Sequence, residues 1–415
     1  MSESSSDEDE SWVFRFNETL QRIKRNDPSV ELIELVGEYI QNMSDEKCEE
    51  LGRDIANNTH LKKVDSSQEL ITDQKLSCLF RGLTRSSSIK DMLFNYNQFS
   101  AAGVRSMVPF LQSANNLTFL DLDDNDNIQS EGFNVLFRAL SESPIETLSC
   151  IGCGIKSIEI DRQRIPYNLT TLNLGYNEIN ADGCSQLAQL LQGGDATLKD
   201  LSLGHNKIDD DGVEILIDAL KSNTSLRELY LSGNDAISKR GNSLLLKLVN
   251  NISCIEATLR SNHTLTCLYL YMDGNLDQQL QLATKINLDN VSSPEAAGRE
   301  KVIQTQLHSK RRAEFAARQG VNHSVYSEID PLHLPEVLAL VGHHNGQGEL
   351  YHALKSSIAE LISTVNEKQS IQQQIAYHTA RLKELGNRLA VIEAAEEGTV
   401  SVESESRCIK RRREC

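Results

Sequence analysis

Two cysteines separated by two residues, Cys150 and Cys153, form the short motif in this chain that is most typical of metal or redox chemistry. A structural zinc site needs four ligands, and no second cysteine pair stands at matching spacing in the sequence. The pair therefore has two interpretations, a metal or redox site and two buried side chains. The repeat pattern described below favours the second.

Four histidines lie within one short stretch, at His333, His343, His344 and His352. No carboxylate or thiol stands at a clear metal-ligand spacing from them, so a loop is the favoured interpretation. The phosphate-binding patterns GxxxxGK[ST] and GxGxxG do not occur, and neither does the GxSxG turn of hydrolases. The sequence therefore predicts no enzyme, no cofactor and no metal site.

A repeat organises the middle of the chain. Leu169, Leu198 and Leu226 begin successive copies that start 29 and 28 residues apart. With these leucines as position 1, leucine recurs at positions 4 and 6, and asparagine at position 9. In the complete copies isoleucine follows at position 11, glycine at 15 and leucine at 19. A fixed period in this range indicates a solenoid.

One repeat unit is expected to form a strand followed by a helix. The leucines at positions 4 and 6 alternate, so they point to one face of a short strand. The asparagine at position 9 can hydrogen-bond the main chain where the strand ends. Leu187, Leu190 and Leu191 stand at helical spacing. Because one unit cannot bury both faces, stacking of units must provide the core.

The pattern LxxLxLxxNxIxxxGxxxLxxxL resembles the leucine-rich repeat in its ribonuclease-inhibitor-like subtype, over roughly residues 30–290. This resemblance implies an α/β fold, a right-handed α/β horseshoe, here with a C-terminal α-helical extension. It also implies that cysteine is accepted at position 9. Cys153 then occupies position 9 and Cys150 the buried position 6, which explains the motif without a metal.

The same frame predicts less regular copies on both sides. Copies starting at Ile33, Leu61, Ile89 and Leu117 follow one another at intervals of 28 residues. The copy from Ile145 lacks the glycine and the helical leucines, so its helix is expected to be short or missing. The copy from Leu226 is long, with its excess around 252–261, and the last recognisable copy begins at 265.

Positions 2, 3, 5, 7 and 8 are expected to project from the concave side of the strands, the usual binding face of such a solenoid. Tyrosine combined with charge is typical of interface hot spots. The predicted protein-binding residues are Tyr96, Phe119, Asp121, Asp123, Asp124, Asn173, Tyr176, His205, Arg227, Tyr230, Tyr269 and Tyr271. The alternative is that these side chains only keep a solvated face soluble.

Composition narrows the choice of partners. The net charge of −17 argues against duplex nucleic acid, because phosphate binding needs a basic surface. No apolar run is long enough for a membrane span. An acidic N-terminus and an odd number of cysteines, nine, predict reduced thiols and a cytoplasmic location. The nucleus is the alternative, because Lys410–Arg413 fits either a weak import signal or a soluble tail.

We expect the chain to divide into five segments. These are a disordered acidic tail (1–10), a leucine-rich repeat domain with an N-terminal helical cap (11–290), a linker and charged helix (291–330), a helical hairpin with a coiled-coil-like helix (331–396), and a disordered tail with a basic end (397–415). Residues 361–392 hold about three heptads, which predicts either self-association or a helix packed on this chain's own cap.

The favoured function is a non-enzymatic scaffold that binds a protein partner on the concave face. A Ran-type small-GTPase-activating protein is the alternative, because that family shares this repeat subtype and length. That family carries an acidic segment after its repeats, which this chain lacks, and Arg227 is the main arginine on the concave face. An innate-immune-like sensor ranks last, because no nucleotide-binding domain precedes the repeats.

Overall fold

The protein is described here from a computed structural model, which covers residues 5–161, 164–192, 197–253, 255–271, 274–302 and 304. The chain divides into two compact units, 1–306 and 307–415. The second unit lies outside the described residues. The predicted hairpin and coiled-coil-like helix (331–396), the self-association segment (361–392), the basic tail and the histidine group therefore lie outside them too.

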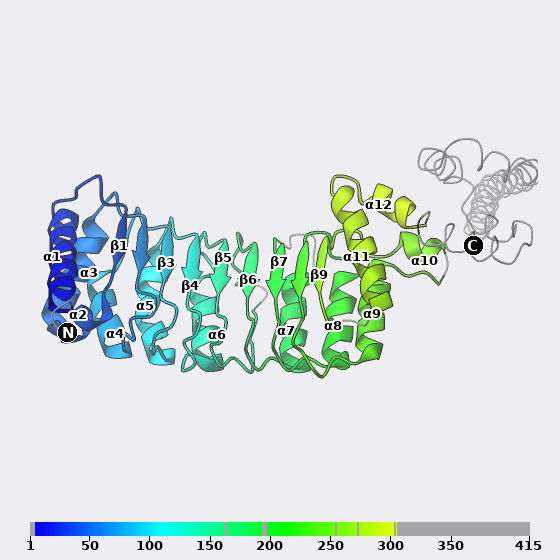
Figure 1. Ribbon diagram of the computed structural model, residues 1–415, viewed down its shortest axis with the longest axis horizontal. Helices are drawn as coiled ribbons and strands as arrows, with labels where there is room; N and C mark the ends of the chain where they lie inside the picture. The colour runs from blue at the N-terminus through cyan, green and yellow to red at the C-terminus, as the bar shows by residue number, and fades with distance from the viewer. Residues whose placement is uncertain are drawn as a thin grey trace, which may run out of the picture. The chain divides into compact units, whose positions relative to one another are not determined.

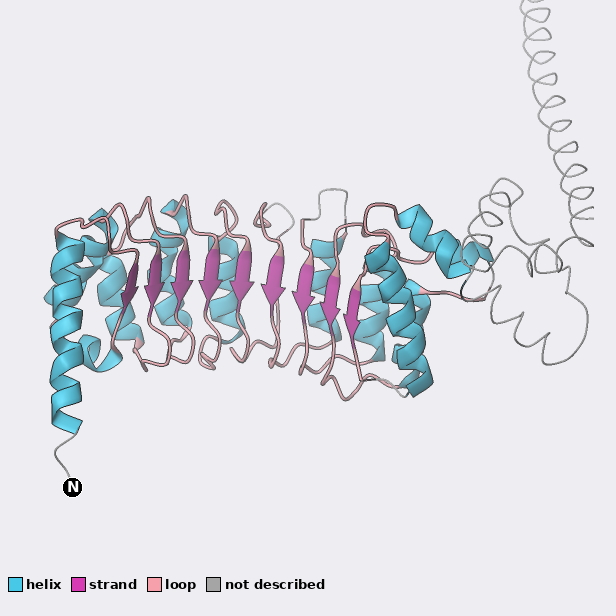
Figure 2. Ribbon diagram, turned by 45° about the horizontal axis from the view of Figure 1, so that its top comes forward, coloured by secondary structure: helices cyan, strands magenta, loops and turns pink. Residues whose placement is uncertain are grey.

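The first unit is built on one parallel sheet whose nine strands follow the chain in order from β1 to β9 (Figures 1 and 2). Each strand is three residues long and pairs in register with its neighbours. The strands are β1 (Leu32–Glu34), β2 (Lys63–Asp65), β3 (Asp91–Leu93), β4 (Phe119–Asp121), β5 (Thr147–Ser149), β6 (Thr171–Asn173), β7 (Asp200–Ser202), β8 (Glu228–Tyr230) and β9 (Cys267–Tyr269).

Helices cover one face of this sheet and leave the other face open (Figure 2). They are α1 (Ser5–Lys24), α2 (Gly37–Asn42), α3 (Asp45–Asn57), α4 (Asp73–Gly82), α5 (Ala101–Ser113), α6 (Gln129–Ala139), α7 (Ala181–Leu191), α8 (Asp210–Leu220), α9 (Lys239–Val249), α10 (Ile255–Leu259), α11 (Gly274–Asp289) and α12 (Pro294–Lys301). The open, unclosed sheet backed by helices is an α/β solenoid, which confirms the predicted fold class.

The repeat positions explain why each unit forms a strand and then a helix. Leucines at positions 4 and 6 are fully buried between sheet and helices, as at Leu172 and Leu174. Position 12 begins the helix, because Ser100, Asn180 and Asp209 each accept a hydrogen bond from a first-turn N–H. In these three repeats the cap at position 12 marks where the turn from the strand ends and the helix begins.

The asparagine at position 9 connects neighbouring units, as predicted. The Asn125 amide donates to the Phe94 and Leu122 carbonyl oxygens, both at 2.9 Å, and its Oδ1 accepts from the Phe99 N–H at 3.2 Å. Asn97, Asn177, Asn206 and Asn234 repeat this arrangement. Because such buried main-chain groups are costly to leave unpaired, this column of asparagines fixes one unit against the next.

The unit between β5 and β6 departs from the others in the predicted way. In its described residues, 150–161 and 164–170, the chain forms no helix. Ile158 and Ile160 are buried there instead and continue the core. The long unit after β8 holds its excess in α10, which also agrees with the predicted position of the insertion.

The register of the first repeat, the one that contains β1, differs from the prediction. Ile33 pairs with Val64, so Ile33 occupies position 4 and not position 1. Val30 begins this unit, and Leu35 takes the buried position 6. The 28-residue interval before β2 was a coincidence of apolar residues, because this unit contains two helices, α2 and α3, and is longer.

Both ends of the compact unit 1–306 contain more helix than the sequence indicates. Helix α1 begins at Ser5, inside the segment expected to be a disordered tail. Helix α12 begins at Pro294, inside the segment 291–330 that was expected to hold a linker and then a charged helix. It is attached through Lys301, whose fully buried Nζ donates to the Val249 carbonyl at 2.6 Å and the Asn262 carbonyl at 3.3 Å. Among the described helices, none has the length and apolar character needed to cross a bilayer.

Candidate functional site: the open face of the sheet

The open face is the side of the sheet away from the helices, formed by the side chains at repeat positions 3, 5, 7 and 8. The predicted binding residues follow the strands in order. Phe119 and Asp121 lie in β4, Asn173 in β6, Tyr230 in β8 and Tyr269 in β9. The residues Tyr96, Asp123, Asp124, Tyr176, His205 and Tyr271 follow the carboxyl ends of strands, and Arg227 immediately precedes β8.

Position 8 has an unusual backbone in every unit from β2 to β8. The φ angles are positive: 63° at Gln68, 55° at Tyr96, 54° at Asp124, 61° at Gly152, 53° at Tyr176, 53° at His205 and 77° at Gly233. The cause is a hydrogen bond between units. The Tyr96 N–H donates to the Asp123 carbonyl at 2.8 Å, and the Tyr176 N–H to the Gly204 carbonyl at 2.9 Å. These hydrogen bonds continue the pairing between neighbouring repeats beyond the end of the strand. The residue at position 8 adopts a left-handed backbone conformation in order to make them.

Side chains at position 8 contact the next unit along the solenoid. In what we name the Tyr96 triplet (Tyr96, Asp124 and Gly152), the Tyr96 hydroxyl hydrogen-bonds Asp124, which raises the pKa of Tyr96. At Gly152, an added Cβ would lie 2.6 Å from the Asp124 Oδ1. The glycine therefore leaves the space that the aspartate occupies.

The Tyr176 triplet (Tyr176, His205 and Gly233) has the same arrangement with aromatic rings. The Tyr176 and His205 rings stack, with centroids 4.1 Å apart and planes 13° from parallel. An added Cβ at Gly233 would lie 2.4 Å from the His205 Nδ1. Each triplet thus ends at a glycine that accepts its neighbour's side chain.

The acidic side chains of β4 have partly structural roles. The Asp123 Oδ1 accepts from the Ser149 hydroxyl and from the Ile151 N–H, both at 2.7 Å, and so connects β4 to the helix-free unit. Burial raises the pKa of Asp123 to about 6, and the charge of Asp121 adds to this. Burial also raises the pKa of Asp121. Within the predicted acidic group, Asp121 and Asp123 are thus carboxylates that the fold itself buries, and Asp124 bonds the Tyr96 hydroxyl.

A second aromatic pair lies at the far end of the face. The Tyr230 and Tyr269 rings stack with centroids 4.3 Å apart and planes 14° from parallel. The Tyr230 hydroxyl donates to the Glu228 carboxylate. Burial and that hydrogen bond together raise the pKa of Tyr230 well above its usual range. Tyr269 and Tyr271 are 47% and 76% exposed, so both offer ring surface to a partner.

Three of the predicted binding residues are less available for binding than the sequence indicates. Arg227 donates to the Thr264 carbonyl at 3.4 Å, which ties its guanidinium to the neighbouring unit. Phe119 and Asn173 are only half-exposed. Sequence reasoning missed Glu228 and Asp200, which occupy position 3 beside the second aromatic pair. Their position in the repeat frame could have identified them.

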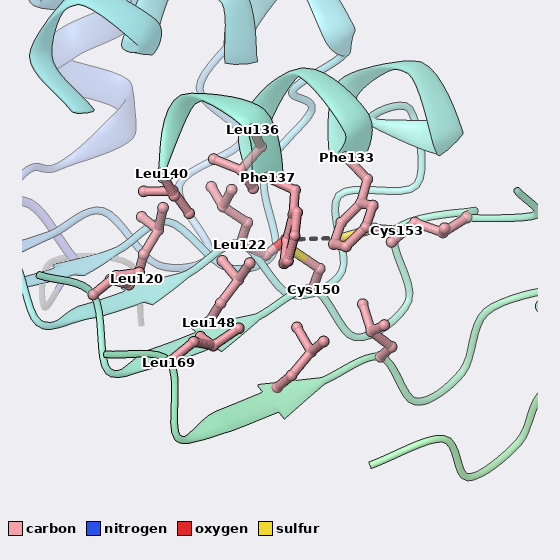
Figure 3. Packing of buried hydrophobic residues seen from close by; sticks show 14 of the residues in the cluster. Leu120, Leu122, Phe133, Leu136, Phe137, Leu140, Leu148, Cys150, Cys153 and Leu169 are labelled. Carbon is pink, nitrogen blue, oxygen red and sulfur yellow. Dashed lines mark hydrogen bonds between the residues drawn. The ribbon is translucent and has the colours of Figure 1, made fainter. Parts of the chain in front are cut away.

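The two cysteines of the CxxC motif are core residues. Cys150 and Cys153 are fully buried, and the Cys153 Sγ donates to the Leu122 carbonyl at 3.1 Å. Figure 3 shows them among Leu122, Phe133 and Phe137. The hydrogen bond with Cys153, together with burial, holds the pKa of Cys150 well above its ordinary value. Within the described residues, no group of three or more His, Cys, Asp or Glu side chains could hold a metal ion.

Comparisons with known proteins agree with this architecture. A family model described as Leucine Rich repeat matches residues 113–133, 168–188, 194–216 and 222–245. The chain therefore carries leucine-rich repeats. No curated protein matches the sequence. The solved structure "Leiomodin-1 Actin-Binding Site 2 (ABS2)" is 13% identical with a TM-score of 0.15, and the match covers 72% of this chain and 97% of that chain. A likeness at this level carries no argument about a partner.

Proposed function

We propose that this protein is an interaction scaffold that binds a protein partner on the open face of its sheet. The observation that carries the proposal is the presence of exposed aromatic rings at strained backbone positions. Tyr96 and Tyr176 have positive φ angles, and they are 50% and 63% exposed. A left-handed conformation costs a residue with a Cβ roughly 1–2 kcal/mol.

Within the fold these side chains make a hydrogen bond from Tyr96 to Asp124 and a stack of Tyr176 on His205, and half or more of each residue stays exposed to water. Gly152 and Gly233 occupy the same repeat position, so the solenoid accepts a residue without any side chain there. Bulky, exposed residues at costly positions are found where recognition needs them. Tyrosines with a polar tip and a rigid ring are the side chains that most often anchor protein interfaces.

The geometry adds no support to the GTPase-activating alternative. Arg227, the main arginine that the sequence places on this face, donates to the Thr264 carbonyl of the neighbouring repeat. No observation in the described part of the chain favours the sensor alternative over a scaffold.

Affinity capture with the full chain tests the proposal. Tyr176→Asn and Asp124→Asn should each reduce recovery of specific partners several-fold, because asparagine tolerates the left-handed backbone but removes the ring or the charge. The matched controls are Tyr167→Asn and Glu142→Gln, which change an exposed tyrosine and an exposed glutamate outside the strands. Equal recovery with all four variants would contradict a role for the open face.

A further inference from the structure

The open face carries a large excess of negative charge. Its acidic side chains are Glu34, Asp65, Asp91, Asp121, Asp123, Asp124, Asp200 and Glu228. Among the described residues at positions 3, 5, 7 and 8, Lys63 is the one lysine or arginine, and its Nζ lies 3.2 Å from an Asp65 carboxylate oxygen. Position 2, at the edge of the face, adds four cations (Lys62, Lys90, Lys199 and Arg227) and two carboxylates (Glu31 and Glu146), so carboxylates outnumber cations on the described face by ten to five. Charge complementarity therefore selects a cationic occupant for this face.

The Tyr230–Tyr269 pair offers more than charge. The Tyr230 hydroxyl holds the Glu228 carboxylate beside the stacked rings. Asp200 lies one strand away, in register with Glu228. Burial raises the pKa of Asp200, a hydrogen bond from the Thr171 hydroxyl at 3.2 Å partly offsets this, and the charge of Glu228 raises the pKa further, so the two carboxylates interact. An exposed aromatic ring flanked by carboxylates is complementary to a planar cation.

Arginine fits this arrangement better than lysine. A guanidinium stacks flat on a tyrosine ring and can donate two parallel hydrogen bonds to a carboxylate. A lysine ammonium is a compact, strongly hydrated charge that cannot do both. The ring of Tyr269 is about half exposed and so accessible for stacking.

We propose that the partner presents a basic, arginine-bearing segment that runs across the strands. One arginine stacks on the side of the Tyr269 ring that Tyr230 leaves open, where the nearby carboxylates of Glu228 and Asp200 add long-range attraction, and a second cationic group meets Asp124 in the Tyr96 triplet. This inference rests on the proposed function for the location of the interface, and it adds the chemistry of the partner.

The sheet fixes how far apart the two cations stand. Asp124 follows β4 and Tyr269 lies in β9, five strands further along the sheet order. Neighbouring strands are about 4.8 Å apart, so the two sites are separated by roughly 24 Å. An extended chain advances about 3.3 Å per residue and spans this distance in about seven residues.

Fluorescence anisotropy with the full chain and labelled synthetic peptides tests this inference. The probe has two arginines about seven residues apart in a serine and glycine background. Two comparison peptides carry lysine in place of both arginines, or the same arginines about three residues apart. We expect the probe to bind at least about tenfold more tightly than either comparison peptide at low salt.

Two variants of the protein test which residue contacts which part of the peptide. Tyr269→Leu should remove the preference for arginine over lysine, and Asp124→Asn should weaken both long-spaced peptides to a similar extent. Tyr167→Leu serves as the control for loss of an exposed tyrosine. Equal affinity for the arginine and lysine peptides would overturn the inference, and so would unchanged binding to a folded Tyr269→Leu variant.

The failure of this inference is distinct from the failure of the proposed function. If arginine is not preferred but partner capture still depends on Tyr176 and Asp124, the open face binds a partner of other chemistry. If arginine is preferred but capture ignores the open-face variants, the proposed function is wrong.

Discussion

The Tyr96 triplet and the Tyr176 triplet share one backbone and differ in chemistry. Both have left-handed residues at position 8, and both end at a glycine that makes room for the preceding side chain. The first joins a phenol to a carboxylate, whereas the second stacks a tyrosine on a histidine. The repeat therefore sets the backbone of this face, and the side chain at position 8 decides which chemistry each region of the face presents.

The two regions also differ in how firmly their side chains are tied to the fold. Around the Tyr96 triplet, Asp123 connects β4 to the helix-free unit through hydrogen bonds to Ser149 and Ile151. In the Tyr176 triplet, the contact is a stack between two rings. The acidic region should therefore respond to pH and salt, and the aromatic region to side-chain shape.

The largest expected effect comes from filling the glycine that ends each triplet. Gly233→Ala should lower the free energy of unfolding by about 2–3 kcal/mol, because the new Cβ would clash with His205 ring atoms and the alanine would have to keep the positive φ of the glycine. Gly152→Ala should lower it by about 1–2 kcal/mol, because the Asp124 carboxylate can rotate away. Urea unfolding of both variants in parallel measures the difference.

A double variant checks the cause of that difference. His205→Ala combined with Gly233→Ala removes the clash and keeps the backbone strain. The pair should then be less destabilised than the sum of the single variants by about 1 kcal/mol. Equal losses for the two glycines and strict additivity would show that the two triplets do not differ as described.

Salt should separate the two regions in partner binding. The loss of affinity caused by Asp124→Asn should shrink about threefold or more between about 0.05 and 0.5 M salt, because ions screen exposed charges. The loss caused by Tyr176→Asn should change little, because ring contacts are not screened. Titrations of a captured partner against both variants across this range provide the measurement. If both variants lost affinity with the same dependence on salt, the two regions would not differ in the kind of contact they make with the partner.

The pH dependence of stability should be specific to the acidic region. The folded-state pKa of Asp123 is about 6, above its ordinary value of 3.8. The native state therefore holds this proton between those values, and the associated stability is lost as the pH rises through about 6. Asp123→Asn can still accept both hydrogen bonds and cannot ionise.

The unfolding midpoint of Asp123→Asn relative to wild type should therefore rise between about pH 4 and 7. Thermal unfolding followed at several pH values tests this, with Glu142→Gln as a control that should show no such trend. A constant difference from wild type would mean that Asp123 titrates normally.

The smallest effect should come from the hydroxyl of Tyr230. Tyr230→Phe keeps the ring stack and loses the hydrogen bond to Glu228, so it should cost about 0.5–1 kcal/mol of unfolding free energy. Tyr230→Leu, which also removes the stack, should cost more. If the two variants were equally stable, ring stacking would contribute nothing measurable at this end of the face.

Much of the fold was predictable because the spacing of leucine and asparagine in the repeat defines which residues of neighbouring strands pair. The leucines at positions 4 and 6 and the asparagines at position 9 have the roles that their spacing indicates, and the unit with no helical leucines has no helix in its described part. The first unit was assigned wrongly because Ile33 and Val36 are both apolar. Either could fill position 4, and only the pairing of Ile33 with Val64 decides between them.

The candidate site was less predictable. Position counting places Tyr96, Asp124, Tyr176 and His205 on one face, and the glycines at the same position of two other repeats, Gly152 and Gly233, are the sequence's signal for a left-handed backbone there. The two tyrosines give no such signal. That conformation follows from hydrogen bonds to the next unit. Glu228 was overlooked for a related reason, because its importance comes from the hydroxyl of Tyr230 two residues away on the same face.

By itself, the sequence determined the period, the strand and helix of each unit, and the face on which the variable side chains lie, because these depend on spacing along one unit. The tertiary structure alone decided which of those side chains meet. Tyr176 and His205 are 29 residues apart in the chain, yet parallel strands stacked in register bring their rings to 4.1 Å. Contacts between units are set by that stacking, and no single unit contains them.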